Sequence, residues 1–544
     1  MNPDGRFKNI RVYWLAVIAY WGIVLFGYDT SVILFYLQNV TYPSSHRSGI
    51  AGGVVSQAYF QQHFGLIDAN GKPNAKLVAD VSSNVVSVLQ AGAFFGALGS
   101  APISSRIGRR WTLVIFALVF ALGAVLTTIA GGSRGLSYIY AGRVVSGVGI
   151  GAISAVAPAY VSECSPKNVR GRITGLFQIM VALGVMISYF INYGVGIHFA
   201  SSAKVWRIPF GFQLVPAGIM VLGLLTVKES PRWLASRNRT EEAIANLAYL
   251  RRDVGDSHAI KHEYAEIEAQ IMEEREARKG LGLKEAFFGK GNFVRFNIAF
   301  FIFLLQQWSG QNSVGYYAPQ IFTQIGYTGH TNSLLASGVY GVVKVVATTI
   351  SIFGLVESLG RKKALFISAL GMGTLFFIIG AILKTHPVVA PVPGAATIPP
   401  APASKAMAAM LYIYVCFYSL GWGPLPWVYV ADIFPTRTRH YGLATASASQ
   451  WLFNFVVAKV TPTLELDLGY KLFFMFGTIN IAGMAVFSVF LPETKGRSLE
   501  EMDIIFGAVS ADKRQADIQK EEQALDQEVN SQRSVDHLDI DTKA

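Results

Sequence analysis

The stretch "YVSECSPKNVRGR", residues 160–172, decides how the rest of the chain is interpreted, because a second copy follows it. The copy, "YVADIFPTRTRHYG", begins at Tyr429. In each copy an acid comes three residues after the tyrosine, and a proline follows three residues after the acid. An arginine stands seven residues after the acid, so that the matched pairs are Glu163 with Arg170 and Asp432 with Arg439.

Two further pairs of motifs repeat in the same order. "RIGRRWTL" at 106–113 is echoed by "SLGRKKAL" at 358–365, and "KESPRWL" at 228–234 by "LPETKGRSLE" at 491–500. The spacing between copies is similar for all three pairs, to within differences in loop length. The sequence therefore predicts two parallel halves, an organisation found in transporters that bind their substrate between the halves.

The composition indicates an integral membrane protein. Hydrophobic residues make up 52% and charged residues 15% of the 544 residues, and the mean hydropathy is +0.39. A soluble domain has a more even balance. The net charge of +12 comes from basic residues in short loops between apolar segments, which indicates membrane orientation rather than nucleic-acid binding. The two cysteines indicate neither a disulfide framework nor a metal site.

Apolar segments of about 20 residues predict membrane-spanning helices. We identify twelve, at 12–34, 84–104, 112–131, 138–161, 173–195, 207–227, 297–322, 333–355, 364–384, 406–430, 441–462 and 470–491. The predicted fold class is an all-α integral membrane protein with twelve transmembrane helices in two pseudo-symmetric six-helix halves and a cytoplasmic helical linker. Basic clusters share the side of the N-terminus, which predicts a multi-pass protein of the cell membrane with both termini cytoplasmic.

This topology predicts five regions: a cytoplasmic N-terminus (1–11), a first half (12–227), a linker (228–296), a second half (297–491) and a cytoplasmic tail (492–544). Within the linker, "EYAEIEAQIMEEREARK" predicts an amphipathic helix. The loop after the first helix contains the sequon Asn39-Val40-Thr41, a candidate glycosylation site.

The repeated acids and arginines predict salt bridges across the cytoplasmic face. Such bridges would hold an outward-open state and break when the halves rock; the alternative is that these charges only set topology and solubility. The predicted network comprises Arg106, Arg110, Glu163, Arg170, Glu229, Arg232, Glu357, Arg361, Asp432, Arg439 and Glu493.

Polar residues on otherwise apolar helices predict a substrate site. Gln306, Gln307 and Asn312 lie around Gly310, where the helix can bend, and amides supply both the donors and the acceptors that a polyol needs. The alternative is that they are interhelical hydrogen bonds only. Tyr316 and Tyr317 are candidates for an outer gate. "GWGPLPW" breaks the tenth helix, as a gating hinge requires, and its gating residues are Gly421, Pro424 and Pro426.

These motifs resemble the sugar porter family of the major facilitator superfamily over nearly the whole chain. The resemblance is carried by "GRVVSGVGIGAISAVAPAYVSECSPKNVR" (142–170), "KESPRWL", "QQWSGQNSVGYY", "GPLPWVYVADIFPTRTR" and "PETKG". Within that family, "NVVSVLQAGAFFGAL", "INYGV" and "YGVVKVV" look like the fungal branch that includes quinate permeases and hexose transporters. The departures, Ser105-Arg106 for Asp-Arg, Lys228 for Pro and Asp432 for Glu, affect the loop salt-bridge partners and not the fold.

The resemblance implies roles for further residues. Asp29, in "FGYDT", matches the helix-one acid of bacterial sugar–proton symporters, which pairs with a helix-four arginine, here Arg143. The pair would form a proton switch; the alternative is a fixed ion pair that only holds helices together. The positions that match sugar-contacting residues of the family are Gln178, Trp427, Gln450, Trp451 and Asn454.

Lys344 lies half-way along the eighth predicted helix, too deep for its ammonium to reach the interface. Asp29 is the only acid that we identify in the predicted helices, and its expected partner is Arg143. Lys344 is therefore expected to face a hydrated cavity or to bind an anionic substrate.

The predicted function is uptake of a monosaccharide or related polyol by proton symport through alternating access. The alternatives are symport of an anionic polyol such as quinate or galacturonate, facilitated diffusion of hexose, and a non-transporting sugar sensor. No catalytic set, metal site or cofactor is expected, and the proton gradient is the expected energy source. The expected partners are the substrate, the proton and the bilayer, with no nucleic acid, and the carrier is expected to function as a monomer.

Overall fold

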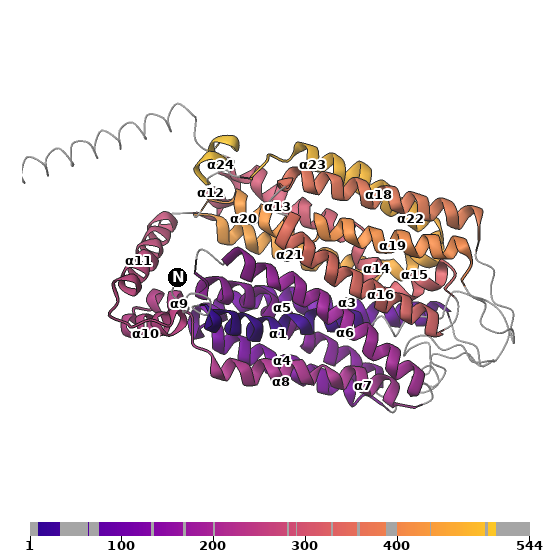
Figure 1. Ribbon diagram of the computed structural model, residues 1–544, viewed down its shortest axis with the longest axis horizontal. Helices are drawn as coiled ribbons and strands as arrows, with labels where there is room; N and C mark the ends of the chain where they lie inside the picture. The colour runs from indigo at the N-terminus through magenta and orange to yellow at the C-terminus, as the bar shows by residue number, and fades with distance from the viewer. Residues whose placement is uncertain are drawn as a thin grey trace, which may run out of the picture.

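The computed structural model describes residues 9–32, 64, 75–131, 135–166, 170–199, 202–279, 282–289, 291–327, 330–355, 359–387, 400–435, 437–495 and 499–507. Asn39 lies outside these residues. All secondary-structure elements within them are helical. Figure 1 shows two packed bundles with their helices roughly parallel, the first half in purple and the second in orange.

The first half contains α1 (Ile10–Val32), α3 (Ala75–Ile107), α4 (Arg109–Thr128), α5 (Gly135–Cys164), α6 (Arg170–His198), α7 (Lys204–Phe212) and α8 (Leu214–Thr226). The linker contains α9 (Pro231–Ser236), α10 (Thr240–Arg251), α11 (His258–Arg278) and α12 (Leu283–Phe288). The second half contains α13 (Asn292–Gln307), α14 (Gln311–Tyr316), α15 (Ala318–Gln324), α16 (His330–Ile350), η4 (Ser351–Leu355), α18 (Arg361–Thr385), α19 (Pro402–Leu420), α20 (Leu425–Ile433), α21 (Arg439–Leu468), α22 (Lys471–Thr478), η5 (Ile479–Ala485) and α23 (Val486–Phe490), and α24 (Leu499–Ile505) follows.

The linker helices and the start of α1 lie at the same end of the bundle, which we name the linker end (Figure 1). The opposite end, where α1 finishes and α3 begins, is named the loop end. The linker attaches to the first half: Arg11 Nη1 donates to the carbonyl of Tyr249 at 2.7 Å, and Arg251 Nη1 donates to the carbonyl of Cys164 at 2.9 Å. Apolar side chains of α9, α10 and α11, including Trp233 and Leu247, form a small core of their own.

Ten helices within the described residues are long and apolar enough to cross a membrane. The two other predicted segments have identifiable reasons for falling short. Segment 297–322 is broken into α13, α14 and α15, and segment 441–462 lies inside α21, which carries Lys459 and Glu465. Because α21 continues beyond the predicted segment to Leu468, it carries a buried acid outside that segment: Glu465 is 7% exposed.

The breaks in α13–α14 and α19–α20 expose backbone carbonyls that interior side chains satisfy. Gly310 adopts φ 90°, a conformation that favours glycine, and starts the new helix. The carbonyl of Ser309 beside it accepts from Tyr414 OH at 3.1 Å and Asn480 Nδ2 at 2.9 Å. At the other break, Gln306 Nε2 donates to the carbonyls of Trp422 (2.6 Å) and Gly423 (3.2 Å). Non-helical backbone at this depth requires such partners.

Candidate functional site

A fully buried ion pair lies inside the first half. Asp29 of α1 and Arg143 of α5 both have 0% exposed side chains, and Arg143 Nη1 donates to Asp29 Oδ1. Gln213, between α7 and α8, donates from Nε2 to the same oxygen at 2.5 Å. The Arg143 guanidinium also lies 4.8 Å from the ring centroid of Phe210, a favourable position for a cation.

The neighbouring residues hold Asp29 in place. A Cβ on Gly27 would lie 2.0 Å from the carbonyl oxygen of Val181, so only glycine lets α1 approach α6 this closely. Tyr28 OH donates to the carbonyl of Pro209 at 2.9 Å. Asp29 Oδ2 and Arg143 Nε and Nη2 nevertheless have no hydrogen-bond partner among the described residues. The pair is thus buried but incompletely satisfied, and a change in protonation can rearrange it.

A chain of amides runs through the second half. Gln307 Nε2 donates to Gln306 Oε1 at 3.3 Å, and Asn312 Nδ2 donates to Gln307 Oε1. Asn312 also reaches Asn454 Oδ1 at 3.4 Å, and the same oxygen accepts from Tyr316 OH at 2.7 Å. These residues come from α13, α14 and α21, so the broken helix brings its two parts and α21 to one point.

Two predicted residues differ from their expected positions. The amide nitrogen of Gln306 donates to the backbone carbonyls of the α19–α20 break, as described above, and so stabilises that break. Tyr317 was expected beside Tyr316 at an outer gate, but it is fully buried and donates to the carbonyl of Ala458 at 2.8 Å, within the second half. Its neighbour Tyr316 is the one that contacts the first half, because Gln90 Nε2 of α3 donates to its hydroxyl at 3.2 Å.

The remaining predicted substrate residues are not hydrogen-bonded to the amide chain. The ring of Trp427 lies 4.6 Å from that of Phe303, and the ring of Trp451 lies 5.4 Å from that of Phe26 in the first half. Gln450 Oε1 is buried and has no partner among the described residues. Gln178 is half-buried on α6. Gln178, Gln450 and the half-buried Trp427 retain polar capacity or ring surface for a ligand, whereas Trp451 is 3% exposed and packs in the core.

Lys344 lies on α16, on the side of the helix that faces the interface between the two halves. Four residues earlier, Tyr340 OH donates to Gln311 Oε1 at 3.0 Å in the second half. Three residues earlier, a Cβ on Gly341 would touch Met186 of the first half at 3.0 Å. Lys344 is half-buried, and no hydrogen bond or ion pair joins its ammonium to the described residues. A membrane-helix cation with no protein partner is a candidate ligand-binding group.

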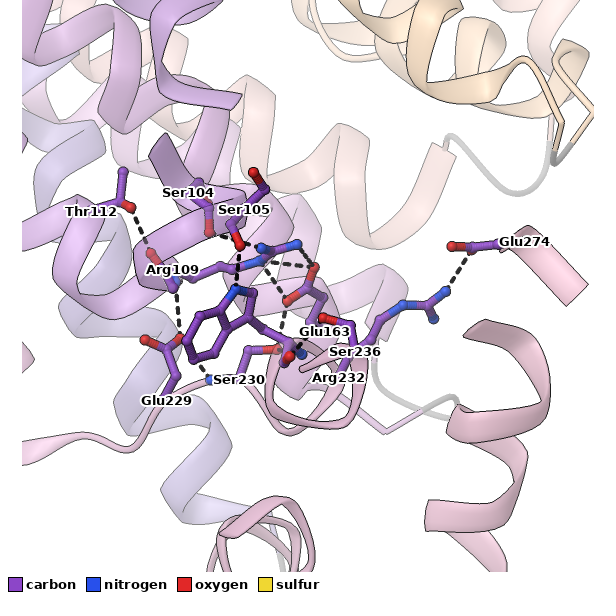
Figure 2. Close-up of polar contacts among 12 residues, drawn as sticks. Ser104, Ser105, Arg109, Thr112, Glu163, Glu229, Ser230, Arg232, Ser236 and Glu274 are labelled. Carbon is purple, nitrogen blue, oxygen red and sulfur yellow. Dashed lines mark hydrogen bonds and ion pairs between the residues drawn. The ribbon is translucent and has the colours of Figure 1, made fainter. Parts of the chain in front are cut away.

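The linker end of the first half carries a network of charged side chains, which we name the first clamp (Figure 2). Arg109 contacts Glu163 through Nε and Nη2 at 2.9–3.2 Å, and Ser230 Oγ donates to Glu163 Oε2 at 2.5 Å. Glu229 accepts from the backbone N–H groups of Arg109 and Arg110 at the start of α4. Burial raises the pKa of Glu229 even though these N–H groups favour its ionised form.

The second half repeats this network at the corresponding positions, and we name it the second clamp. Arg361 Nε lies 3.5 Å from Asp432 Oδ2, and Thr494 Oγ1 donates to the same oxygen at 3.0 Å. Glu493 accepts from the backbone N–H groups of Arg361 (2.9 Å) and Lys362 (3.1 Å) at the start of α18. Burial alone would raise the pKa of Glu493, but the backbone N–H groups around it outweigh burial and lower the pKa.

The structure corrects the predicted salt-bridge network in several places. Among the described residues, the ion pairs of this network lie within one half or involve the linker, and none joins the two halves. Arg106 is exposed, and Arg109 pairs with Glu163 in its place. Arg110 donates to the carbonyls of Leu224 and Leu225. Arg439 donates to the carbonyl of Phe434, and Arg232 pairs with Glu274 of the linker at 2.6 Å. Glu357 and the side chain of Arg170 lie outside the described residues.

The sequence interpretation missed two amides. Gln213 binds the buried carboxylate, and Gln90 joins α3 to Tyr316 across the two halves. Gln213 is the one amide of predicted helix 207–227, and Gln90 shares predicted helix 84–104 with Asn84. Amides in apolar helices are the same signal that singled out Gln306 and Gln307. Applied to every helix, that signal finds both.

Comparison with known proteins gives a family and a set of relatives. The profile of the family described as "Sugar (and other) transporter" matches residues 15–506. A probable quinate permease of Aspergillus niger is 37% identical over 506 residues, covering 92% of this chain and 88% of that protein. A quinate permease of Emericella nidulans is 36% identical over 502 residues, covering 92% and 89%.

Two solved structures share the fold. One is the major facilitator superfamily proton:xylose symporter XylE bound to 6-bromo-6-deoxy-D-glucose, with a TM-score of 0.72 and 24% identity, covering 92% of this chain and 100% of that one. The other is the inward-open conformation of XylE from E. coli, with a TM-score of 0.70 and 24% identity, covering 91% and 99%. The predicted all-helical fold of two six-helix halves is thereby confirmed.

Proposed function

The chain belongs to the sugar transporter family, and from this premise we propose that it is a proton-coupled carrier that takes up a cyclic polyol bearing a carboxylate. Membership makes it a multi-pass membrane transporter. The finer statements, namely the substrate, the coupling and the orientation, are the content of this proposal. The observation that carries it is Lys344, a half-buried cation between the halves that has no protein partner among the described residues.

The substrate class follows from the chemistry of the second half. Ring hydroxyls match the amides of Gln307, Asn312 and Asn454, which offer donors and acceptors together. A carboxylate on the same ring matches the ammonium of Lys344 through a charge-assisted hydrogen bond. The names of the fungal relatives, quinate permeases, support the same class. A neutral monosaccharide is the second candidate, favoured by the amide chain and the two tryptophan rings, which need no charge.

Coupling is assigned to the buried ion pair. Opening towards an acidic medium exposes Asp29 and protonates it, which releases Arg143; closure restores the pair. For a neutral substrate, one proton moving down about 150 mV and one pH unit supplies about 5 kcal/mol, sufficient for a concentration ratio of several thousand. For a singly charged anion the potential terms of the proton and the substrate cancel, so the pH unit alone supplies about 1.4 kcal/mol, a tenfold ratio. No cofactor is needed, because the gradient is the energy source.

The orientation follows the basic side of the chain. Arg11, Arg109 and Arg361 lie at the linker end, which we place in the cytoplasm together with both termini. The loop end then faces outward, in the plasma membrane. Because one chain supplies the ion pair, the amides and Lys344, a monomer is sufficient for transport.

The test is an uptake panel in cells that lack their own carriers. Labelled quinate, galacturonate, glucose and xylose are each supplied while a pH-sensitive dye reports proton entry. Accumulation of an acidic polyol with matching proton entry supports the proposal. Uptake of glucose without either acid establishes the neutral alternative, uptake that only equilibrates indicates facilitated diffusion, and no uptake of any polyol indicates a sensor.

A further inference from the structure

Among the residues that the structure describes, three hydrogen-bonded contacts join the two halves near the loop end. Lys459 Nζ of α21 donates to Ser83 Oγ of α3 at 3.1 Å and to Asn84 Oδ1. Gln90 of α3 donates to Tyr316, as described above. Tyr189 OH of α6 donates to the carbonyl of Gly315 at 2.8 Å. All three must separate if the loop end opens, because each has one partner in each half.

The Lys459 contact differs from the other two in charge. An ammonium inside a membrane helix is costly and is rarely retained without a role. Here it is half-buried, and its two acceptors, Ser83 Oγ and Asn84 Oδ1, are neutral oxygens on one turn of α3. Hydrogen bonds from a charged donor are shorter and stronger than those between neutral groups. Of the three contacts, this one therefore opposes separation of the halves most strongly.

The contact is also distinct from the candidate substrate and proton groups. Lys459 lies five residues beyond Asn454 on α21, which is about 7.5 Å further along the helix towards the loop end. It contacts neither the amide chain nor the Asp29–Arg143 pair. Removing its charge can therefore change the balance between conformations without removing a group that we assign to substrate or proton binding.

We propose that Lys459 is a latch: its contact with Ser83 and Asn84 favours conformations closed at the loop end, and its release sets how often that end opens. This rests on the proposed function, because a latch has meaning only in a carrier whose halves separate alternately. Ser83 and Asn84 of α3 supply the acceptors that hold the Lys459 ammonium. Lysine suits this role because its flexible stem can withdraw the charge to water when the contact breaks.

The experiment measures access from outside in the absence of substrate. Ser87 of α3 is 1% exposed and lies between Asn84 and Gln90, so Ser87→Cys reports opening of the loop end to a membrane-impermeant maleimide. Cys416, which is exposed, is first replaced by serine, while the buried Cys164 is kept. In this background Lys459→Gln is expected to raise the labelling rate about fivefold. Asn84→Ala raises it in the same direction, and Lys459→Arg stays near the parent.

Matched variants make the result decisive. Lys471→Gln removes an exposed lysine at the start of the next helix and should leave the rate unchanged. The double variant Lys459→Gln/Asn84→Ala should label no faster than the faster single variant, because both remove one contact. Unchanged rates in both single variants, or effects that simply multiply, overturn the latch. Should Lys459→Gln fail to reach the surface, Asn84→Ala and Ser83→Ala carry the test with the lysine in place.

The labelling rate requires no substrate. If the proposed substrate class is wrong, the uptake panel shows it and the labelling rates of the variants still follow the prediction. If the latch is wrong, the labelling rates of the variants depart from the prediction and the uptake panel is unaffected.

Discussion

The two halves of the molecule have the same clamp at the linker end but different interiors. Glu229 and Glu493 each accept hydrogen bonds from the first N–H groups of a helix, α4 and α18 respectively. Tyr160 and Tyr429 each donate to the carbonyl of the residue before these acids. Inside, however, the first half buries the Asp29–Arg143 pair. The second half instead holds the amide chain and Lys344, whose ammonium has no partner among the described residues. The two halves therefore share the clamp at the linker end and differ in the polar residues of their interiors.

The clamps themselves are unequal in strength. The first joins Arg109 to Glu163 through two guanidinium nitrogens, Nε and Nη2, and the linker adds the Arg232–Glu274 pair beside it. The second has a single 3.5 Å approach between Arg361 and Asp432. The first clamp is therefore the stronger of the two, although the linker also reaches the second half, where Arg437 Nη1 lies 3.1 Å from Glu285 Oε1.

The largest expected effect tests the interior of the first half. Asp29→Asn should abolish accumulation of substrate against its gradient while leaving exchange measurable, because a neutral amide imitates the protonated acid permanently. The measurement is steady-state accumulation with proton entry in the same cells. Asp80→Asn, which changes an exposed acid on α3, is the matched control. If Asp29→Asn cells concentrate substrate as well as the parent, the proton role of the first half is wrong.

The next effect tests the unpaired cation of the second half. Lys344→Asn should lower uptake of an acidic polyol at least tenfold, the loss of one charge-assisted hydrogen bond of about 1.5–3 kcal/mol, while sparing glucose. Lys405→Asn, at an exposed lysine of α19, controls for the change of net charge. Equal losses for acidic and neutral substrates would contradict the assignment of Lys344 to a carboxylate.

Substitutions of two adjacent amides, Gln306 and Gln307, distinguish substrate binding from stability of the fold in the second half. Gln307→Ala should weaken substrate binding by about 1 kcal/mol, roughly fivefold, through a lost hydrogen bond. Gln306→Ala should instead lower the melting temperature, because its amide satisfies the carbonyls of Trp422 and Gly423. Half-saturation constants and thermal melts of both variants check this. The reverse outcome, with Gln306→Ala affecting affinity alone, would place Gln306 in the binding site.

The smallest effect compares the two clamps by pH. The lowered pKa of Glu493 means that its ionised form stabilises the fold above its unfolded pKa of about 4.3, and this contribution is lost as pH falls through the lowered value. The raised pKa of Glu229 has the opposite effect on stability. The contribution of Glu229 to the free energy of unfolding falls as pH rises from about 4.3 through the raised value.

At pH 7, Glu493→Gln should therefore lower the melting temperature by about 2 °C more than Glu229→Gln does. Melts of the purified carrier between pH 4 and 7 provide the check, and the difference between the variants should shrink on acidification. A difference that stays constant across this range would show that the acids act by shape and not by charge.

The sequence by itself was sufficient for the fold and for much of the chemistry. Hydropathy located the helices, the "YVSEC" and "YVADI" copies paired the halves, and polar residues in apolar segments identified Gln306, Gln307, Asn312 and Lys344. The resemblance to the sugar porter family supplied the Asp29–Arg143 pair and Asn454. These features are local: helix length, helical periodicity and residue type can be read along one chain. The same local information placed the breaks at Gly310 and at "GWGPLPW", because glycine and proline act on the backbone at their own position.

Tertiary structure decided which faces meet. Helical spacing states which residues share a face of one helix, but not which neighbouring helix that face contacts. Only packing could therefore show that Gln213 is the third member of the buried pair and that Lys459 reaches Asn84 across the halves. For the same reason only packing shows that Arg109, and not Arg106 or Arg110, binds Glu163. It also showed that Glu465, in the last turn of α21, is only 7% exposed, which depends on the helices packed around it.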